Sequence, residues 1–297
     1  MRKKRLYIFI ALGVLLIAAL ALGGCARQAE LGTEENPLIW VFVPSGEVDR
    51  VTAGGESMAD LIFKETGLVV DIFVATDNTS AIEAMCSDPP KAHMGSLNTF
   101  SYIQAADRGC AEAALVSVRF GSPTYNGQIF VHADSGYNEI SELNGLTFCR
   151  DDAFSTSSWI IPSIELAAVG VEVTPKDAGS HDAAVAGVYE GECDAGASYV
   201  DARSRIEEEH PDVMEVVKVI FQTTDIPNDG VQYVPSLSDE LRTQLTDAFL
   251  AMAATEEGLE AMDTAYQWAG LEAHGDSFYD PFRQLLDAAG ISAADIE

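Results

Sequence analysis

The sequence predicts an α/β protein of two lobes with a ligand cleft between them. Two regions of the 297-residue chain alternate strand-like apolar runs with helical spacing, and a mainly helical segment follows Ser238. Such alternation is typical of parallel or mixed sheets flanked by helices. With 47% hydrophobic residues, the roughly 260 positions beyond the amino-terminal segment can form one large or two medium cores.

The amino terminus has the pattern of an export signal. Residues 1–5 are mostly basic, residues 6–22 are apolar, and two glycines precede Cys25. The apolar run is slightly shorter than the roughly 20 residues that a membrane span needs. Leu-Gly-Gly-Cys also resembles a bacterial lipobox, whose cysteine is lipidated. We therefore predict a signal peptide over 1–24, a lipid anchor at Cys25 and a tether over 25–36, with an uncleaved membrane anchor as the alternative. The protein would then be an exported lipoprotein facing the periplasm or the cell exterior.

The charge of the chain excludes some classes of partner. Four of the 17 Lys and Arg residues lie in the first five positions, and all 47 Asp and Glu residues lie beyond the signal. The mature chain therefore carries 13 minus 47, or −34, with histidine neutral. A protein of this charge is not expected to bind nucleic acid or an anionic lipid surface.

Four cysteines remain when Cys25 is set aside: Cys86, Cys110, Cys149 and Cys193. An even number in an exported chain indicates disulfides, and four cysteines allow three pairings. The first two flank one strand–loop–helix unit, and the last two each adjoin a strand-like run, so we favour pairing 86 with 110 and 149 with 193. No C-x-x-C or Cys/His ligand spacing is present, so we expect no metal site and no cofactor.

The first alternating region spans residues 38–107. Leu38–Val43 is an unbroken apolar run ended by a proline, a serine and a glycine, as expected of a buried parallel strand. The elements predicted after it are helix 58–66, strand 68–74, helix 80–86, strand 92–95 and helix 100–107. A sheet of this order places its ligand crevice at the carboxyl ends of its strands.

A second alternation follows two strand-like runs at 114–120 and 128–132. Further elements are predicted as helix 183–190, strands 193–200, 216–221 and 231–234, and helices 241–254, 258–269 and 280–289. We assign residues 37–122 and 231–297 to one lobe and residues 123–230 to the other.

The hydroxyl turn, Ser155–Ser157, is the stretch with the clearest chemistry. It follows an apolar run at residues 146–148 and precedes Trp159, as the start of a helix would. Unpaired backbone N–H groups and the helix dipole make such a start attractive to anions. Pro162 has no N–H, so we expect a first turn that carries the hydroxyls and a helix that restarts at the proline and runs to about Val169. An ordinary serine N-cap is the alternative.

From Trp40 to about Ile291 the chain resembles the phosphate/phosphite/phosphonate-binding proteins of bacterial ABC importers. The resemblance rests on Met94–Tyr102, Arg119–Tyr125, Asp134–Gly136, Leu143–Gly145, Ser155–Ser157 with Pro162, Gly179–Asp182 and Gly191–Ala195. It implies a type II periplasmic-binding-protein (Venus flytrap) fold that captures a phosphorus oxyanion in the interlobe cleft. It also implies delivery to a permease and its ATPase, and we expect a monomer.

The resemblance implies roles for individual side chains. Ser155, Thr156 and Ser157 match the hydroxyl and N–H grip on a tetrahedral phosphorus head. Tyr125 and His181 match residues that contact the same head, and Asp201 matches an acid that meets the amino group of an aminophosphonate in some members. A core tyrosine, a surface histidine at a helix start and a solvated acid are the structural alternatives. Asp194 is assigned a structural role.

Three further candidates lie in loops after the strands of the first region. Ser45 follows the first strand, Asn98 follows the third, and Asn78 stands where relatives often carry a tyrosine ahead of the helix. The absence of that ring weakens any assignment to one particular organic phosphonate.

Other functions fit parts of the pattern. The same fold could bind a sulfonate or a thiamine precursor, or serve as the ligand-sensing ectodomain partner of a membrane kinase. Ser157, His181 and Asp201 could be arranged as a hydrolase triad, but no G-x-S-x-G elbow is present, so we expect no enzyme activity.

Overall fold

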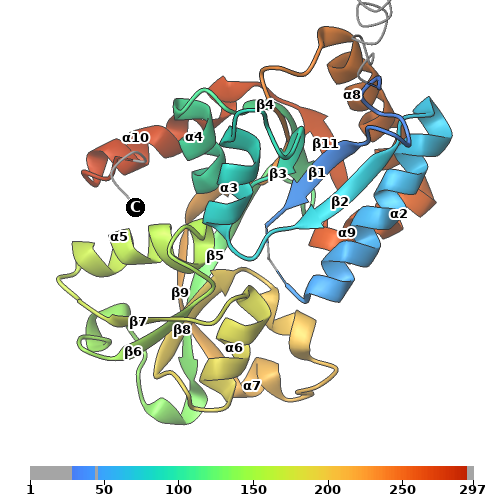
Figure 1. Ribbon diagram of the computed structural model, residues 1–297. Helices are drawn as coiled ribbons and strands as arrows, with labels where there is room; N and C mark the ends of the chain where they lie inside the picture. The colour runs from blue at the N-terminus through green and yellow to red at the C-terminus, as the bar shows by residue number, and fades with distance from the viewer. Residues whose placement is uncertain (1–28, 44–45, 293–297) are drawn as a thin grey trace, which may run out of the picture.

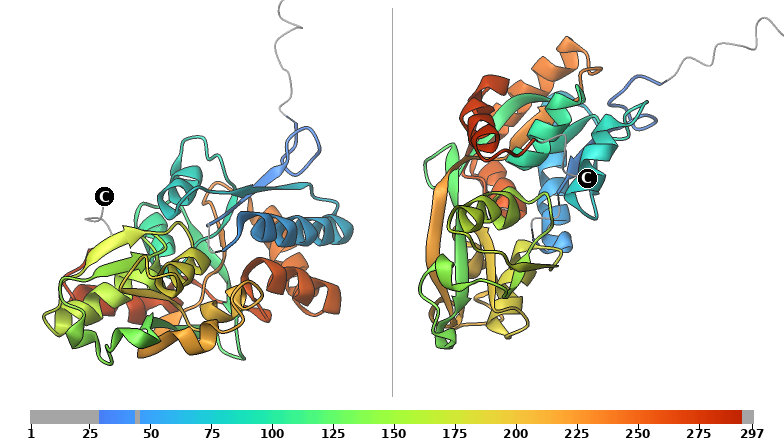
Figure 2. Two further views of the ribbon diagram at one scale, coloured as in Figure 1. Left: turned by 90° about the horizontal axis from the view of Figure 1, so that it is seen from below. Right: turned by 90° about the vertical axis from the view of Figure 1, so that its left-hand side faces the viewer.

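The computed structural model describes residues 29–43 and 46–292 and contains two sheets, one in each of two lobes (Figure 1). The first sheet has six strands and the second has five. Helices pack against both sheets, and Figure 2 shows the two lobes from two further directions. This mixed α/β architecture is the predicted fold class.

The first sheet has the order β11-β4-β10-β3-β1-β2. Its strands are β1 (Leu38–Phe42), β2 (Val70–Val74), β3 (Met94–Ser96), β4 (Glu112–Val118), β10 (Gly230–Tyr233) and β11 (Gly270–Ala273). β1 pairs in parallel with both β2 and β3, which explains why its sequence is an unbroken apolar run. β10 and β11 are antiparallel to their neighbours, so the sheet is mixed.

The helices of the first lobe are α2 (Val48–Thr66), α3 (Asn78–Cys86), α4 (Thr99–Asp107), α8 (Asp239–Ala253), α9 (Glu256–Tyr266) and α10 (Asp280–Ala288). α2 begins ten residues before the predicted helix. Gly54 and Gly55 obscured this part of it, because glycine lowers helix propensity. A Cβ at Gly54 would lie 2.5 Å from the backbone nitrogen of Ala265, so the glycine allows α2 and α9 to pack closely.

The second sheet has the order β7-β6-β8-β5-β9. Its strands are β5 (Thr124–His132), β6 (Thr147–Arg150), β7 (Thr174–Asp177), β8 (Ala195–Tyr199) and β9 (Val217–Pro227). β7 is exposed along its length and has the sequence Thr-Pro-Lys-Asp. It has no apolar pattern, so it was not predicted. β11 was likewise not predicted, because it follows directly on the helical pattern that ends near Ala269.

Helical segments of the second lobe are η3 (Thr156–Ile160), α5 (Ile161–Ala168), α6 (His181–Tyr189), η4 (Ala202–Ile206) and α7 (Val213–Val216). η3 is a single π-helical turn, in which the N–H of Ile160 donates to the carbonyl of Ser155 at 3.0 Å. α5 follows with Pro162 near its start, where the missing N–H has no partner to lose. The helix therefore restarts at the proline as predicted.

Two chain segments connect the lobes. Residues 119–123 join β4 to β5, and Asn228 and Asp229 join β9 to β10. The Asn228 side chain donates to the carbonyls of Ser117 and Ser122, at 2.9 and 3.0 Å, and so ties the two segments together. These two hydrogen bonds stabilise the short segments that run from one lobe to the other.

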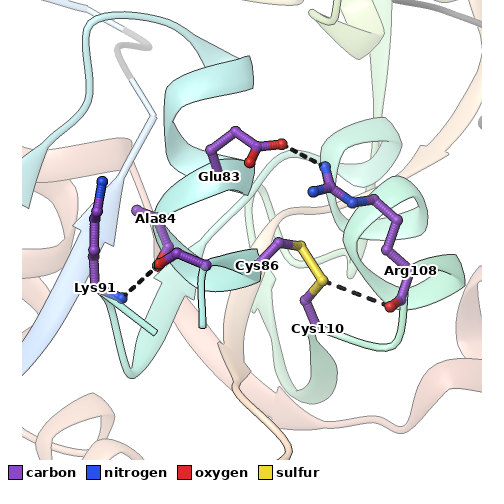
Figure 3. The surroundings of a disulfide bond; sticks show 7 residues. Glu83, Ala84, Cys86, Lys91, Arg108 and Cys110 are labelled. Atoms are coloured by element: carbon purple, nitrogen blue, oxygen red, sulfur yellow. Dashed lines mark hydrogen bonds and ion pairs between the residues drawn. A yellow bond between two sulfur atoms is a disulfide. The ribbon is translucent and has the colours of Figure 1, made fainter. Parts of the chain in front are cut away.

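Both disulfides have the pairing favoured from the sequence. Cys86 at the end of α3 pairs with Cys110 after α4, and their Cα atoms are 4.9 Å apart (Figure 3). An ion pair between Arg108 and Glu83, at 2.7 Å, joins the same two helices. Cys149 on β6 pairs with Cys193, with 5.7 Å between their Cα atoms.

Residues 29–36 form a turn on the first lobe, although the sequence predicted a tether over 25–36. The Gly32 carbonyl accepts a hydrogen bond from the Val69 N–H at 2.8 Å, and Leu31 packs against the core. Cys25 and the predicted signal peptide lie outside the described residues. None of the helices within the described ranges has the length and apolar character that a membrane span requires.

Candidate functional site

A small cavity of about 40 Å³ lies between the two lobes. Its lining is formed by Val43, Arg50, Asn98, Arg119, Tyr125, Asp151, Ser157, His181, Tyr199, Arg205, Asp229, Ala265, Tyr266 and Gln267. A bound water needs roughly 10–15 Å³ of such volume. The cavity in this arrangement therefore has room for about three water-sized groups, which matches a compact ligand head rather than a long chain.

The ends of strands position several lining residues. Val43 follows β1, Asn98 lies just after β3, Asp151 follows β6, and Tyr199 is the last residue of β8. These are carboxyl ends of strands, where the sequence placed the ligand crevice.

Three arginines give the cavity an unusual charge for this protein. Arg50, Arg119 and Arg205 line it, and they are three of only 13 basic residues that follow residue 24. Asp151 and Asp229 are the carboxylic residues of the lining. Cationic side chains are thus concentrated at one point of a strongly acidic chain, which favours an anionic ligand there.

Arg119 is fixed by the connection between the lobes. It is 8% exposed, and its Nη2 lies 3.2 Å from both carboxylate oxygens of Asp229. Asp229 also accepts hydrogen bonds from Ser117 and from the Trp268 indole, at 3.1 and 3.2 Å. Its carboxylate is therefore saturated, and it orients the guanidinium rather than facing a ligand.

The other two arginines reach across the cleft. Arg50 on α2 contacts Asp182 on α6 at 3.0 Å, and Arg205 on η4 donates to the backbone carbonyl of Asp263 at 3.1 Å. Each contact joins the first lobe to the second. Both contacts therefore stabilise the arrangement in which the cavity is enclosed.

The hydroxyls of the hydroxyl turn have different partners. Ser157 lines the cavity and hydrogen bonds to Tyr125. Thr156 donates to the side chain of Asn98 at 2.9 Å and accepts from the N–H of Phe100, so it joins the lobes. Ser155 lies 3.5 Å from His181 and makes no side-chain cap. The ordinary serine N-cap is therefore not what the structure shows, and Ser157 is the member of the turn that lines the cavity.

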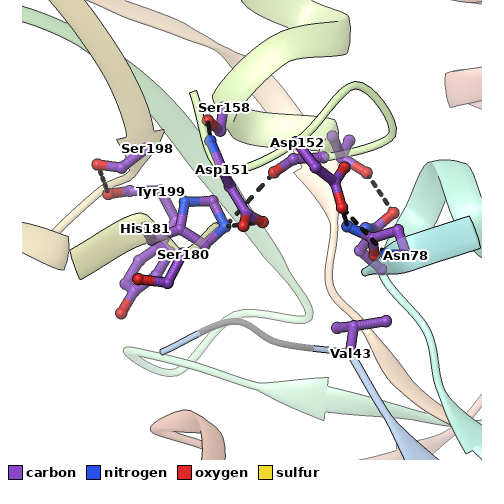
Figure 4. A network of polar contacts seen from close by, with 12 residues as sticks. Val43, Asn78, Asp151, Asp152, Ser158, Ser180, His181, Ser198 and Tyr199 are labelled. Carbon is purple, nitrogen blue, oxygen red and sulfur yellow. Dashed lines mark hydrogen bonds and ion pairs between the residues drawn. The ribbon is translucent and has the colours of Figure 1, made fainter. Parts of the chain in front are cut away.

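His181 and Asp151 face each other in the cavity wall (Figure 4). The Nε2 of His181 is 3.7 Å from Oδ2 of Asp151, and its ring packs edge-on against Tyr199 with centroids 4.9 Å apart. Burial, assisted by the positive charge of Arg119, lowers the pKa of His181 to about 3. The imidazole is therefore neutral near pH 7 and can act as a donor or an acceptor, depending on its tautomer.

Two tyrosines complete the polar wall. Burial raises the pKa of Tyr125 and of Tyr199 to about 12, so both hydroxyls stay protonated and can donate. The guanidinium of Arg119 lies over both rings, 5.8 and 5.6 Å from their centroids. These contacts fix the guanidinium and the two rings relative to one another.

Asn78 lies beside the cavity, in a cluster that connects the lobes. Its N–H and Nδ2 donate to Oδ2 of Asp152 at 3.0 and 2.6 Å, and its Oδ1 accepts from Asn98 at 2.6 Å. Figure 4 shows Asp152 turned toward Asn78 and away from His181. We call Asn78, Asn98, Asp152 and Thr156 the interlobe latch.

One sequence candidate does not line the cavity, and another cannot be placed relative to it. Asp201 follows β8 with a positive φ of 76°, its carbonyl accepts from Ser204, and it is absent from the lining formed by described residues. Ser45 lies outside the described residues. The structure therefore brings together Tyr125, Ser157, His181 and Asn98, with Ser155, Thr156 and Asn78 immediately behind them.

Unpaired buried polar atoms concentrate at this cavity. Seven buried side-chain atoms in the described part of the chain have no hydrogen-bond partner, and four belong to lining residues: Arg119 Nε, Arg205 Nε, Asp151 Oδ1 and His181 Nδ1. Buried polar groups are nearly always paired, so such a concentration indicates a polar ligand. No group of three or more metal-binding side chains occurs within residues 29–43 and 46–292.

The arginines and Asp151 were not predicted from the sequence. Arg119 lies within a stretch quoted for the family resemblance, Arg119–Tyr125, but no local motif indicated a site role. Its function depends on Asp229, which is 110 residues away in sequence. Asp151 stands next to the hydroxyl turn, and its burial in an anion-favouring cavity is visible only in three dimensions.

Residues 40–279 match the family described as "ABC transporter, phosphonate, periplasmic substrate-binding protein". The chain belongs to this family. It is 25% identical over 232 residues to the Phosphonates-binding periplasmic protein of Escherichia coli, covering 75% of this chain and 68% of that protein. It is 23% identical over 274 residues to the Phosphate-import protein PhnD of Mycolicibacterium smegmatis, covering 84% of each.

Solved structures show the same fold. A binding protein component of an ABC phosphonate transporter from Pseudomonas aeruginosa superposes with a TM-score of 0.77 at 24% identity, covering 86% of this chain and 87% of that one. PhnD1 from Prochlorococcus marinus, in complex with methylphosphonate, gives 0.75 at 15% identity, covering 85% and 98%. The matched relatives are substrate-binding transport proteins rather than enzymes, so family membership makes this chain a binding component of an ABC importer.

Proposed function

We propose that this protein is a lipid-anchored receptor that captures a phosphorus oxyanion between its lobes and delivers it to an ABC permease. The observation that carries the proposal is the cavity itself: three arginines gather there in a chain of net charge −30. Exposed charges further away than about 8 Å are largely screened at physiological salt. Local donors therefore decide the affinity for an anion.

Those donors suit a tetrahedral head. Arg119 Nε and Arg205 Nε are buried without a partner, and the hydroxyls of Tyr125 and Ser157 belong to the same lining. Hydrogen bonds in which one group is charged are about twice as strong as neutral ones. Donors from both lobes converge here, so binding of the anion would favour closure of the cleft.

The small volume of the cavity limits the size of the organic group that a phosphorus head can carry. A cavity of about 40 Å³ accommodates phosphate, phosphite or methylphosphonate more readily than a phosphonate with a long organic group. The names of the relatives point to the same class, because they include phosphonate-binding, phosphate-import and methylphosphonate-bound proteins. Asp201 does not line the cavity, so a contact between its carboxylate and the amine of an aminophosphonate would need a different arrangement of the site.

Membrane attachment would keep the receptor near its permease. The lipobox-like sequence before Cys25 supports attachment through a diacylated cysteine, and two acyl chains hold a protein stably at a membrane. Metabolic labelling with a fatty-acid analogue tests this. The full chain is expected to take the label and the Cys25→Ser variant is not; equal labelling of both would remove the anchor from the proposal.

Calorimetric and thermal-shift titration of the chain from Ala26 onward tests the ligand class. The ligands are phosphate, phosphite, methylphosphonate, 2-aminoethylphosphonate, sulfate, a sulfonate and a thiamine precursor. At least one phosphorus compound is expected to raise the melting temperature, by the amount that RT ln(1 + [L]/Kd) gives. A response to sulfonate or thiamine precursor alone would assign the cleft to another solute class.

A pair of serine variants locates the site. Ser157→Ala removes a hydroxyl of the lining and is expected to weaken binding by roughly 1.5–3 kcal/mol, the range for a hydrogen bond to a charged group. Ser141→Ala, at an exposed serine of the second lobe, is the matched control and is expected to bind like the parent. Equal affinities for the two variants would move the ligand away from the hydroxyl turn.

A further inference from the structure

The described chain enters the first lobe through the turn at residues 29–36, which is fixed to that lobe. Besides its hydrogen bond with Val69, the turn is closed by the side chain of Asn36, whose Nδ2 donates to the carbonyl of Ala29 at 2.9 Å. Gly32 has a φ of 91°, and a Cβ added there would lie 2.7 Å from the side chain of Leu68. Glycine is therefore required for the turn to lie this close to the lobe. The folded part of the protein begins at Ala29.

This fixed turn shortens the link between the lobe and Cys25. Four peptide bonds separate Cys25 from Ala29, and twelve separate Cys25 from Pro37. A fully extended chain spans at most about 3.6 Å per residue, so the link reaches about 14 Å with the turn in place and about 40 Å without it. A lipid on Cys25 thus keeps Ala29 within about 14 Å of the membrane surface, whatever conformation the link has.

The direction of the strands places the cavity on the other side of the first sheet. β1 starts next to the turn, at Leu38, and Val43 beyond its carboxyl end lines the cavity, about 16 Å further along the strand. β5 then runs from Thr124, at the connection between the lobes, to His132, about 27 Å into the second lobe. Figures 1 and 2 show the start of the described chain at the end of the first lobe that is remote from the second lobe.

The exposed residues of the turn form what we call the anchor face: Glu30, Thr33, Glu34 and Glu35. Three of these four side chains are acidic, so the anchor face is repelled by anionic lipid headgroups rather than attracted to them. Its distance from a membrane is therefore set by the covalent link and not by the charge of the lipid.

We propose that the anchor face is the surface of this protein that lies against the lipid membrane, with the cavity and the second lobe directed away from it. The inference rests on the proposed attachment through Cys25 and adds the orientation of the attached protein. Turning the molecule over, so that the second lobe met the lipid, would carry Ala29 further from the membrane than the link reaches. The cleft of the anchored receptor then takes its solute from the bulk solution.

Energy transfer to the membrane surface tests the orientation. The full chain, lipidated at Cys25, is placed in phosphatidylcholine vesicles that carry an acceptor dye on a lipid headgroup. Thr33→Cys or Ser141→Cys supplies one free thiol for a donor dye, because the other four cysteines form two disulfides. Ser141 is exposed and follows the far end of β5. Transfer from position 33 is expected to be at least about twice that from position 141, since β1 and β5 lie between them.

Two changes test whether the short link sets the orientation. Inserting about ten Gly and Ser residues between Arg27 and Gln28 adds up to about 35 Å of reach and is expected to remove most of the difference between the two positions. Gly32→Val displaces the turn, because valine disfavours a φ of 91° and its side chain would meet Leu68, and the difference is expected to shrink. Gly136→Val is the matched control: its φ is 82°, it lies on the second lobe, and no atom lies within 4 Å of the added Cβ. The control should keep the parental ratio.

The outcomes separate the orientation from the attachment. If the full chain takes no lipid and does not bind the vesicles, the proposed attachment fails and the orientation fails with it. If the chain is attached but positions 33 and 141 transfer equally, the attachment stands and the molecule lies on its side, which overturns the orientation. A difference that survives the insertion unchanged would also overturn the inference, because the short link would not be its cause.

Discussion

Removing the Asn78 side chain should weaken every ligand to the same extent, because the interlobe latch acts on closure. Asn78→Ala deletes the 2.6 Å hydrogen bond from Nδ2 to Asp152 and the 2.6 Å bond that its Oδ1 accepts from Asn98. The backbone N–H at residue 78 still donates to Asp152. The variant therefore loses part of the latch and keeps the donors of the cavity wall.

The magnitude follows from the charged bond. A hydrogen bond to a charged group contributes about 1.5–3 kcal/mol, and in an open state water replaces the lost partners. A loss of about 2 kcal/mol corresponds to about a 30-fold change in the ratio of closed to open protein. A ligand that binds only the closed state can use only the closed fraction of the protein. Its apparent Kd therefore rises by up to the same factor.

Calorimetry gives the Kd for phosphate, methylphosphonate and any other ligand found, and small-angle scattering gives the closure of the free protein. Asn144→Ala, at an exposed asparagine whose side chain bonds within the second lobe to the Glu172 N–H, is the matched control. We expect no change in Kd there. A 30-fold loss confined to one ligand would contradict the reasoning, because it would make Asn78 a ligand contact; an unchanged Kd would show that the latch does not stabilise closure.

Three further predictions concern other parts of the molecule. Arg119→Met should raise the Kd for phosphorus oxyanions by about 10- to 100-fold, the range for a charge-assisted hydrogen bond, while Arg108→Met at the exposed ion pair with Glu83 leaves the calorimetric Kd unchanged. Because the pKa of His181 is lowered to about 3, the unfolded chain binds a proton between pH 6.5 and about 3 that the folded chain does not. Stability is thus lost as pH falls through this window, by up to about 1.4 kcal/mol per pH unit, and urea unfolding at pH 4.5–7 should show a shallower loss in His181→Gln than in the parent. Replacing Cys149 and Cys193 by serine removes a cross-link between residues 44 positions apart. The free energy of unfolding, measured by urea denaturation, should fall by about 4 kcal/mol. A urea midpoint equal to the parent's would mean that the cross-link does not stabilise the fold.

Local pattern was sufficient for much of the fold. The apolar run at Leu38–Val43 identified the central parallel strand, and Pro162 marked the helical restart after the hydroxyl turn. Features that depend on tertiary packing were missed. The amino-terminal half of α2 contains Gly54, whose close approach to Ala265 cannot be seen locally, and exposed β7 is held by pairing with β6 rather than by apolar residues.

The site divides in the same way. The order of strands and helices predicted the hydroxyl turn and the loop at Asn98 as parts of the site, and the family resemblance added His181. Arg119 and Asp229 meet from positions 110 residues apart, and nothing near either residue in sequence indicates the other. Such pairs form only when the chain has folded, so a local sequence pattern can predict the hydroxyl turn but not the paired charges.

An acidic protein can bind an anion because its cavity charges are held by short-range contacts. Arg50 is fixed by Asp182 and Arg119 by Asp229, so each acid orients a cation that lines the cavity. The pairing lowers the net charge of the wall but spares the arginines the penalty of isolated burial. Asp151 is the exception, because no arginine in the described part of the chain forms an ion pair with it, and burial raises its pKa well above the ordinary range. The same cavity therefore combines cations fixed by acidic partners, which favour an anion, with one buried carboxyl that has no such cationic partner among the described residues.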